Sequence, residues 1–307
     1  MTPQPATPRE PNDRDALAFY AEPGAMTNAG HHQRALAELP DDIGGLASVI
    51  QGLCVHQYMA DAYGFKVPEG RKAESHIRAA DAIIDRILAL DDRPLSAARP
   101  VDRRVVGVCH HFALLMTTML RAKGIPARYR CGFGAYFNAP WFEEHLVCEY
   151  WSKADSRWIL VDPQLDAVWR RALKFGFDSL DVPSDQFVIA GDAWTQCRSG
   201  RADPSKFGIF VGDLRGLWFI AAELIRDVAA LSKLEMLPWD VWGAMPRPDQ
   251  RLGDDQLNFF DRLAALTDDP DRSFAKLRAV YEDDDRVRVP ATVFNAVLNR
   301  PEALSLA

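Results

Sequence analysis

The sequence lacks the cysteine patterns that mark disulfide-stabilised or zinc-binding proteins. It has five cysteines, an odd number, and no two of them form a CxxC pair. This spacing argues against a disulfide framework and against a zinc site built from thiolates. We therefore expect free thiols, and the question is which of them reacts: Cys54, Cys109, Cys131, Cys148 or Cys197.

Long apolar runs and an excess of positive charge are also missing. No segment approaches the roughly 18 consecutive apolar residues that predict a membrane-spanning helix. The first 15 residues are polar and proline-rich, without the apolar stretch of a secretory signal. The formal net charge is −7, so there is no broad basic surface for nucleic acid or anionic lipid. We predict a cytoplasmic protein that binds neither nucleic acid nor a membrane.

Two signatures of other enzyme classes are absent as well. The glycines of CGFG are not followed by Gly-Lys-Ser or Gly-Lys-Thr, so they do not predict a phosphate-binding loop. No GxSxG elbow occurs, so the sequence does not support a serine hydrolase. We expect no cofactor.

The chain is long and apolar enough to bury a substantial core, with 307 residues of which 48% are hydrophobic. Residues 1–12 have the composition of a disordered segment. Apolar residues at helical spacing predict helices over 43–63 and 73–90. A third helix is predicted from Val108, ending at a Lys-Gly step shortly before Pro126.

After the third helix the apolar period changes to two. This predicts strands over 125–134, 145–151 and 157–162, the last two joined as a hairpin by SKADS. We predict an α+β fold with N-terminal helices, a central antiparallel sheet and a helical C-terminal extension. The catalytic core would occupy 13–166, and a helical region over 167–307 would pack on it. Helical patterns in that second region cover 164–175, 184–198, 213–233, 254–266, 271–282 and 290–299.

Cys109 is the strongest candidate for a nucleophile because it stands at the predicted start of the third helix. Backbone N–H groups at a helix N-terminus carry partial positive charge, which stabilises a thiolate and lowers its pKa. The same groups can stabilise the oxyanion of a tetrahedral intermediate. Gly107 would let the chain turn tightly and leave space for substrate beside the sulfur. The other four cysteines are interpreted as structural.

The predicted hairpin supplies a base and a group to orient it. His145 and Asp162 fall on one face of the hairpin. A four-residue loop at 152–155 places them directly opposite each other, and a two-residue loop makes them diagonal neighbours. Both registers put their β-carbons within about 4.5–8 Å. Asp162 could then orient the imidazole of His145 while its other nitrogen faces the thiol.

Three blocks of sequence carry a family resemblance: GVCHHFALLMTTMLRAKGIPARYRCGFG, EEHLVCEYW and RWILVDPQLD. Together they resemble the transglutaminase-like cysteine enzymes of the papain-related superfamily, over roughly residues 73–166, about a third of the chain. The resemblance implies that Cys109, His145 and Asp162 form a catalytic triad. It also implies acyl transfer through a thioester. The family includes peptidases, amidases, peptide N-glycanases and amide-forming acyltransferases, so the expected partner is an amide- or peptide-bearing substrate.

Two further residues are candidates for substrate contacts. His110 follows the candidate nucleophile directly, and Trp141 lies in the predicted loop GAYFNAPWFEE. His56 is another candidate for the cleft, although a core or capping role is favoured. The adjacent pair His110 and His111 does not predict a metal site, because neighbouring side chains on a helix point about 100° apart. We expect no metal.

These observations predict a cysteine-dependent acyl-transfer enzyme. It would be an amide or peptide hydrolase or an amide-forming acyltransferase, with hydrolysis favoured on general grounds only. The alternative is a catalytically silent binding or scaffold protein that keeps the transglutaminase-like fold. The intact set of Cys109, His145 and Asp162 argues against this alternative, since a silent descendant need not keep all three.

Overall fold

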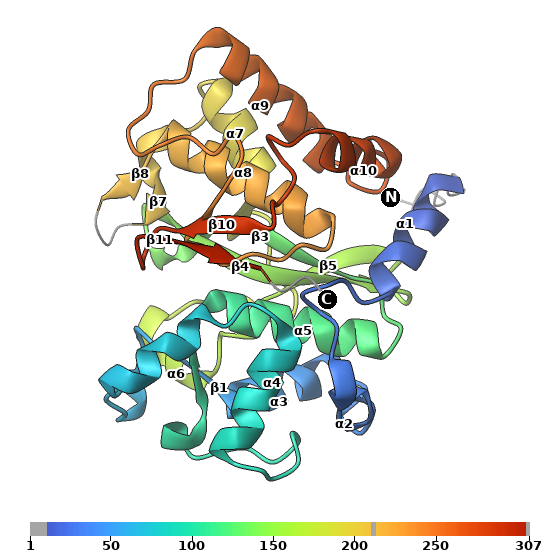
Figure 1. Cartoon of the computed structure of the whole chain (residues 1–307), viewed down its shortest axis with the longest axis vertical. Helices are drawn as coiled ribbons and strands as arrows, with labels where there is room; N and C mark the ends of the chain where they lie inside the picture. Colours follow the sequence, from blue (N-terminus) through green and yellow to red (C-terminus); the bar gives the residue numbers. More distant parts are fainter. Residues whose placement is uncertain (1–10, 210–212, 305–307) are drawn as a thin grey trace.

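A central sheet separates two groups of helices in the computed structural model, which describes residues 11–209 and 213–304. The helices within residues 33–122, together with Ala167–Leu173, lie on one side of the sheet, and the helices within residues 190–283 lie on the other (Figure 1). The fold is α+β, as the sequence predicts. In the described part of the chain, no helix has the length and apolar character needed to cross a membrane.

The early helices are α1 (Pro11–Ala21), α2 (Gln33–Ala37), α3 (Ile43–Leu53) and α4 (Ala80–Leu90). Residues 1–10 of the segment expected to be disordered lie outside the described residues, and residues 11 and 12 already belong to α1.

Two of the predicted helices are shorter than their apolar patterns. The expected helix over 43–63 stops at Leu53, because β1 (Cys54–His56) pairs in parallel with β2 (Val105–Gly107). The expected helix over 73–90 begins only at Ala80, after a 3-10 helix, Glu69–His76. Tertiary pairing with a distant segment therefore overrides the local helical pattern at 54–56.

The central sheet is built on two long strands, β3 (Ala127–Asn138) and β4 (Trp141–Ser152), which pair antiparallel. β5 (Arg157–Val161) pairs antiparallel with one end of β4. The shorter strands complete the order β6-β3-β4-β7-β8, with β6 at Phe187–Ile189, β7 at Phe207–Ile209 and β8 at Leu214–Arg215. An antiparallel sheet was expected, but the sheet is mixed, because β7 runs parallel to β4.

The C-terminal half contains helices and short strands. Its helices are α6 (Ala167–Leu173), α7 (Ala190–Arg198), α8 (Leu217–Leu231), α9 (Asp254–Thr267) and α10 (Phe274–Asp283). A three-stranded sheet joins β9 (Asp240–Val241), β10 (Thr292–Asn295) and β11 (Arg300–Ala303).

The helix predicted over 290–299 is wrong. This segment forms β10 and the turn to β11, and burial alternates along β10, with Val293 and Asn295 inside. The reason is tertiary pairing, because β10 pairs antiparallel with β11 on one side and with β9 on the other. The starts of two other predicted helices are likewise strands, since 187–189 form β6 and 214–215 form β8.

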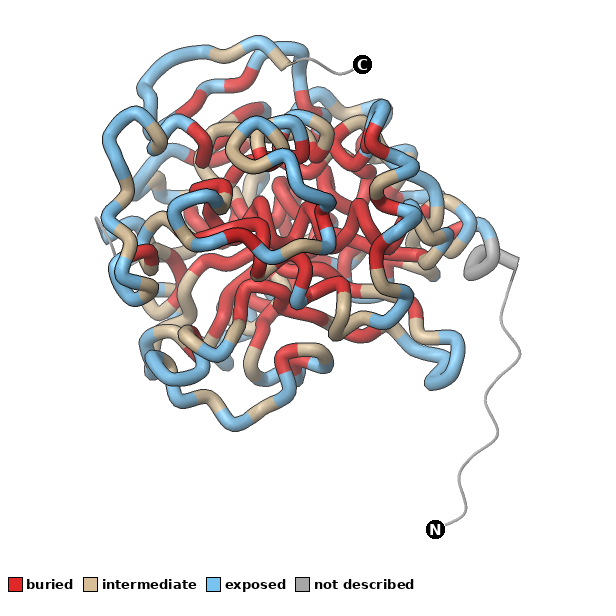
Figure 2. Tube along the Cα trace, turned by 90° about the horizontal axis from the view of Figure 1, so that it is seen from below, coloured by how far each residue is buried: buried red, intermediate tan, exposed pale blue. Residues whose placement is uncertain are grey.

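One hydrophobic cluster runs through both halves of the chain, from Ala16 to Val293. Figure 2 shows the buried residues gathered in the interior, with the exposed ones at the periphery. A buried ion pair between Arg130 of β3 and Asp227 of α8 also joins the halves, with a nitrogen–oxygen distance of 2.8 Å. The expected division at residue 166 stays a prediction, and the two parts share a core.

Candidate active site

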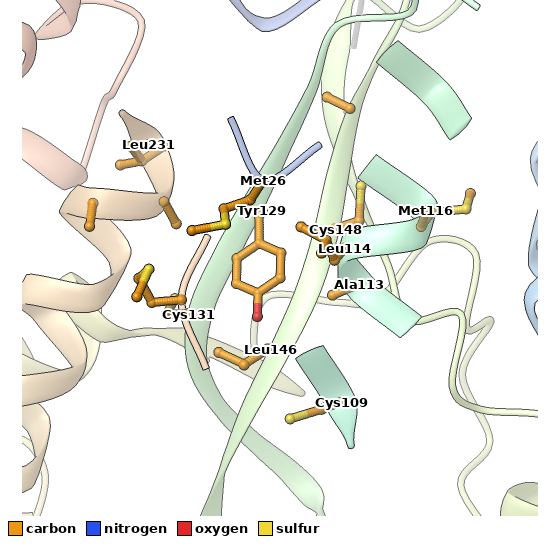
Figure 3. Close-up of a cluster of buried hydrophobic side chains, with 14 of the residues drawn as sticks. Met26, Cys109, Ala113, Leu114, Met116, Tyr129, Cys131, Leu146, Cys148 and Leu231 are labelled. Carbon is orange, nitrogen blue, oxygen red and sulfur yellow. The ribbon is translucent and has the colours of Figure 1, made fainter. Parts of the chain in front are cut away.

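Cys109 is the first residue of α5 (Cys109–Ala122), directly after β2. Val108 precedes it in extended conformation as the N-cap residue. The side chain is 6% exposed. Figure 3 shows Cys109, Ala113 and Met116 along α5, beside β4, the strand that carries Leu146 and Cys148. The sulfur therefore lies at the N-terminal end of a helix that packs on the central sheet.

Gly107 is required for a reason that the sequence did not reveal. A Cβ at this position would lie 2.6 Å from Cγ of His111, closer than real side chains approach. The absent side chain makes room for the His111 ring on the first turn of α5. Gly107 therefore has a packing role, and its expected role, a space for substrate beside the sulfur, stays a prediction.

His145 and Asp162 meet as the hairpin predicted. β4 and β5 pair Ser152 with Arg157 and Cys148 with Val161. Extending this register makes His145 and Asp162 diagonal neighbours. The diagonal placement is one of the two that were expected, but the loop has four residues, 153–156, and not the two that were expected with it. Nε2 of His145 lies 2.8 Å from Oδ2 of Asp162.

Asp162 is held by two further donors. The hydroxyl of Tyr136 donates to Oδ2 at 2.8 Å, and the backbone N–H of Gln164 donates to Oδ1 at 3.0 Å. Both carboxylate oxygens are therefore fixed in place. With Nε2 of His145 bound to this carboxylate, Nδ1 is the ring nitrogen left to exchange a proton with a reacting group.

Cys109 and His145 both line one large cleft of about 850 Å³. Asp162 lies behind His145 and is 1% exposed. The other wall of the cleft comes from the C-terminal half, mainly α8 and residues 238–248. Its lining residues there include Trp218, Phe219, Glu223, Arg226, Trp239 and Met245. The region that the sequence did not explain therefore shapes the space in front of the thiol.

The electrostatics at Cys109 differ from the expectation. Burial raises the pKa of the Cys109 thiol well above its usual value, and the carboxylates of Glu144 and Glu223 raise it further. The backbone N–H of His110 lowers this pKa, as expected of a helix start, and so does the backbone N–H of Leu146 on β4, but the two do not outweigh burial. The prediction of a lowered thiol pKa is wrong, and the neutral thiol is favoured.

The two candidates for substrate contacts do not line the cleft. His110 is fully buried, with Nδ1 at 2.9 Å from the Tyr129 hydroxyl and Nε2 at 2.9 Å from the Arg78 carbonyl oxygen. Burial lowers the pKa of His110 to about 4, so it is neutral at pH 7. Trp141 opens β4, where Nζ of Lys206 lies 3.7 Å from its ring centre. His56 does line the cleft, and it is held on β1.

Sequence reasoning missed four polar residues of this site. Gln164 lines the cleft. Its position two residues after Asp162, in the block DPQ, could have identified it as a residue of the site. Glu223 is a lone acidic residue within the apolar run LWFIAAELI of α8, which was a second signal. No local pattern marked Tyr136 or Glu144, because their roles depend on contacts with distant segments.

One group of side chains in the described ranges could hold a metal ion, and it lies outside the cleft. His31, His32 and Asp85 each offer a ligand atom, and these atoms lie within 4.8 Å of one another. His32 is buried, and its Nε2 lies 2.7 Å from Oδ1 of Asp85. His111 cannot join His110 at one ion, because its Nε2 lies 3.1 Å from the Glu74 carbonyl oxygen.

The chain shares sequence with known proteins in the part that carries this site. Residues 67–163 match the sequence profile of the transglutaminase-like superfamily. A protein-glutamine gamma-glutamyltransferase from Pseudomonas aeruginosa is 26% identical, over 52% of this chain and 28% of that protein. The chain thus spans only about a quarter of that relative's length.

A solved structure from Cytophaga hutchinsonii, of a provisionally named cysteine protease, is also similar. It is 19% identical, with a TM-score of 0.33 over 58% of this chain and 48% of that one. A superposition this loose supports no comparison of the two sites.

Proposed function

Residues 67–163 belong to the transglutaminase-like superfamily, and we propose that the chain is a cysteine-dependent acyl-transfer enzyme that works through a thioester on Cys109. The observation that carries the proposal is the joint position of three groups. Cys109 and His145 line one cleft, and His145 is bound to Asp162 at 2.8 Å. This is the arrangement of nucleophile, base and orienting carboxylate that acyl transfer needs.

In the proposed reaction, Sγ of Cys109 attacks the carbonyl carbon of an amide or ester. The thiol proton passes to Nδ1 of His145, whose positive charge Asp162 stabilises. The backbone N–H groups at the start of α5 stabilise the oxyanion. When the tetrahedral intermediate collapses, the bond to the leaving amine or alcohol breaks, and His145 returns the proton to it.

The second half of the reaction resolves the thioester. Water or an amine attacks the acyl carbon and gives its proton to His145, and Sγ leaves and recovers a proton. Water produces an acid, and an amine produces a new amide. Because the neutral thiol is favoured, proton transfer to His145 has to accompany substrate binding or attack.

The experiment is intact-mass spectrometry after incubation with an activated acyl donor, such as a short peptide thioester, followed by acid quenching. We expect one acyl adduct, located on Cys109 by peptide mapping and removed by hydroxylamine. Cys109→Ala should abolish the adduct. Cys197→Ala is the matched control, because Cys197 is not a cleft residue and its loss should leave adduct formation nearly unchanged.

The silent scaffold is the second candidate, because a buried thiol with a raised pKa is also what a structural cysteine shows. The same experiment separates the two. If no acyl group reaches Cys109 from any donor, and iodoacetamide alkylates Cys109 no faster than the same thiol in the unfolded chain at any pH, the enzyme proposal fails.

A further inference from the structure

The walls of the cleft carry buried polar atoms that no described part of the chain satisfies. Oε1 of Glu144 and Oε1 of Glu223 are inaccessible to solvent and have no hydrogen-bond partner among the residues described. The same holds for the indole N–H groups of Trp218 and Trp239. All four residues line the cleft that holds Cys109. Buried polar groups are rarely left unpaired without cause, so this concentration points to a polar ligand.

The two carboxyl groups come from different halves of the chain. Glu144 lies on β4 beside His145, and Glu223 lies on α8. Successive side chains of a strand point to opposite faces, so Glu144 points away from the face of His145. Its cross-strand partner Phe133 packs against Phe219 of α8, which places Glu144 beside this helix. Both carboxyl groups are more than nine-tenths buried.

Arg226 neutralises only part of this charge. Its Nε donates to Oε2 of Glu223 at 3.1 Å, while Nη1 and Nη2 donate to the backbone carbonyls of Leu237, Asp240 and Pro238. The guanidinium is thus committed to Glu223 and to the loop before β9. Two ionised carboxylates and one guanidinium leave one negative charge uncompensated.

The carboxyl groups respond to this burial. Burial raises the pKa of Glu144 well above its usual value, and the carboxylates of Glu223 and Glu143 raise it further. Arg226 lowers this pKa but does not outweigh them. Burial also raises the pKa of Glu223. Arg226 lowers this pKa, Asp227 raises it, and a hydrogen bond from Cys131 lowers it. A ligand cation between the two carboxylates would remove the cost of holding both charges out of water.

We propose that Glu144 and Glu223 form a binding site for a single positively charged group, a primary ammonium or a guanidinium, on a molecule that enters the Cys109 cleft. Trp218 and Trp239 line the same cleft, and aromatic rings favour organic cations. Their indole N–H groups can donate to carbonyl oxygens of the same molecule. The proposal rests on the proposed function only in naming this molecule as a substrate of Cys109.

The first test measures binding alone, so that it does not depend on catalysis. The full chain carrying Cys109→Ala is titrated with n-butylammonium and with its neutral counterpart n-butanol, and binding is followed by saturation-transfer NMR. We expect the ammonium to bind and the alcohol to bind at least about tenfold more weakly, since a charge-assisted contact is lost. Equal binding of the two molecules would overturn the proposed cation site and would not bear on the proposed catalytic role of Cys109.

Variants then locate the site. Glu144→Gln should weaken butylammonium binding about tenfold or more, since it replaces a charged acceptor with a neutral one of the same shape. Glu38→Gln is the matched control, because Glu38 is exposed and pairs with Arg34 on the surface. Unchanged affinity in Glu144→Gln would reject this site. The comparison of two ligands on the parent chain keeps the test valid if the variant folds poorly.

A last arm distinguishes the two sources of the cation. The chain with Cys109 intact is given peptide thioesters that differ only in a lysine or a norleucine side chain, each with butylamine or with 1,4-diaminobutane as the acceptor. Preference for the lysine donor places the cation on the acyl donor. Faster amide formation with 1,4-diaminobutane than with butylamine places it on the acceptor, because one nitrogen of the diamine can stay protonated in the site while the other attacks as the neutral amine. If neither appears while acylation of Cys109 proceeds, the enzyme proposal stands and the cation site falls.

Discussion

The pKa of the Cys109 thiol is subject to two opposing influences. The N-terminus of α5 favours the thiolate, and the N–H groups of His110 and Leu146 lower the thiol pKa. Burial and the carboxylate of Glu144 raise this pKa, and burial is the largest effect. A reactive thiolate therefore has to form with help from His145 or from a ligand that alters the charge of the cleft.

Replacing Glu144 by Gln should make Cys109 easier to ionise. The carboxylate raises the pKa of the thiol, so its removal shifts the pH profile of Cys109 alkylation to lower pH. At pH 9, below the thiol pKa, the rate should rise several-fold. The rate of iodoacetamide modification of Cys109, measured by peptide mass spectrometry from pH 6 to 10.5, checks this. Glu38→Gln should leave the profile in place, and an unshifted profile in Glu144→Gln would show that its charge does not reach the thiol.

At the scale of elements, the sequence predicted the parts whose signal is local. The period of two, the hairpin and the Lys-Gly helix stop are written in consecutive residues, so α5, β4, β5 and the pairing of His145 with Asp162 followed from them. The strands β1 and β10 did not, because short apolar runs acquire their structure from distant partners. Glu144 was missed for the same reason, since its neighbour Glu223 lies on α8.

The junction of β2 and α5 gives a prediction at this scale. Gly107→Ala should destabilise the fold by about 1–3 kcal/mol, because the added methyl group meets the His111 ring in a packed site. It should also slow acylation of Cys109, since relief of the clash moves the first turn of α5. Gly70→Ala is the control, because a Cβ there meets no atom within 4 Å. Urea unfolding of both variants gives the comparison, and equal stability would remove the packing role of Gly107.

At the scale of the whole molecule, the C-terminal half is part of the same structure as the candidate site. α8 supplies cleft residues on one side, and on another it buries Asp227 against Arg130 of β3. The sequence predicted a helix near this position and could not predict its partner, because the ion pair joins residues 97 positions apart. Because α8 takes part in both, a substitution that weakens its packing should lower the free energy of unfolding and also alter the cleft.

Asp227→Ala tests that coupling. Arg130 is 2% exposed and would keep only Glu149 as a charged partner, and the N–H of Cys131 would lose its acceptor. Breaking a buried pair by removing one partner costs about 3–5 kcal/mol. We expect this loss in urea unfolding at pH 7, together with slower acylation of Cys109. Asp181→Ala breaks a half-exposed pair with Arg157 and should cost at most about 1 kcal/mol. Similar losses in the two variants would mean that α8 does not hold the two halves together.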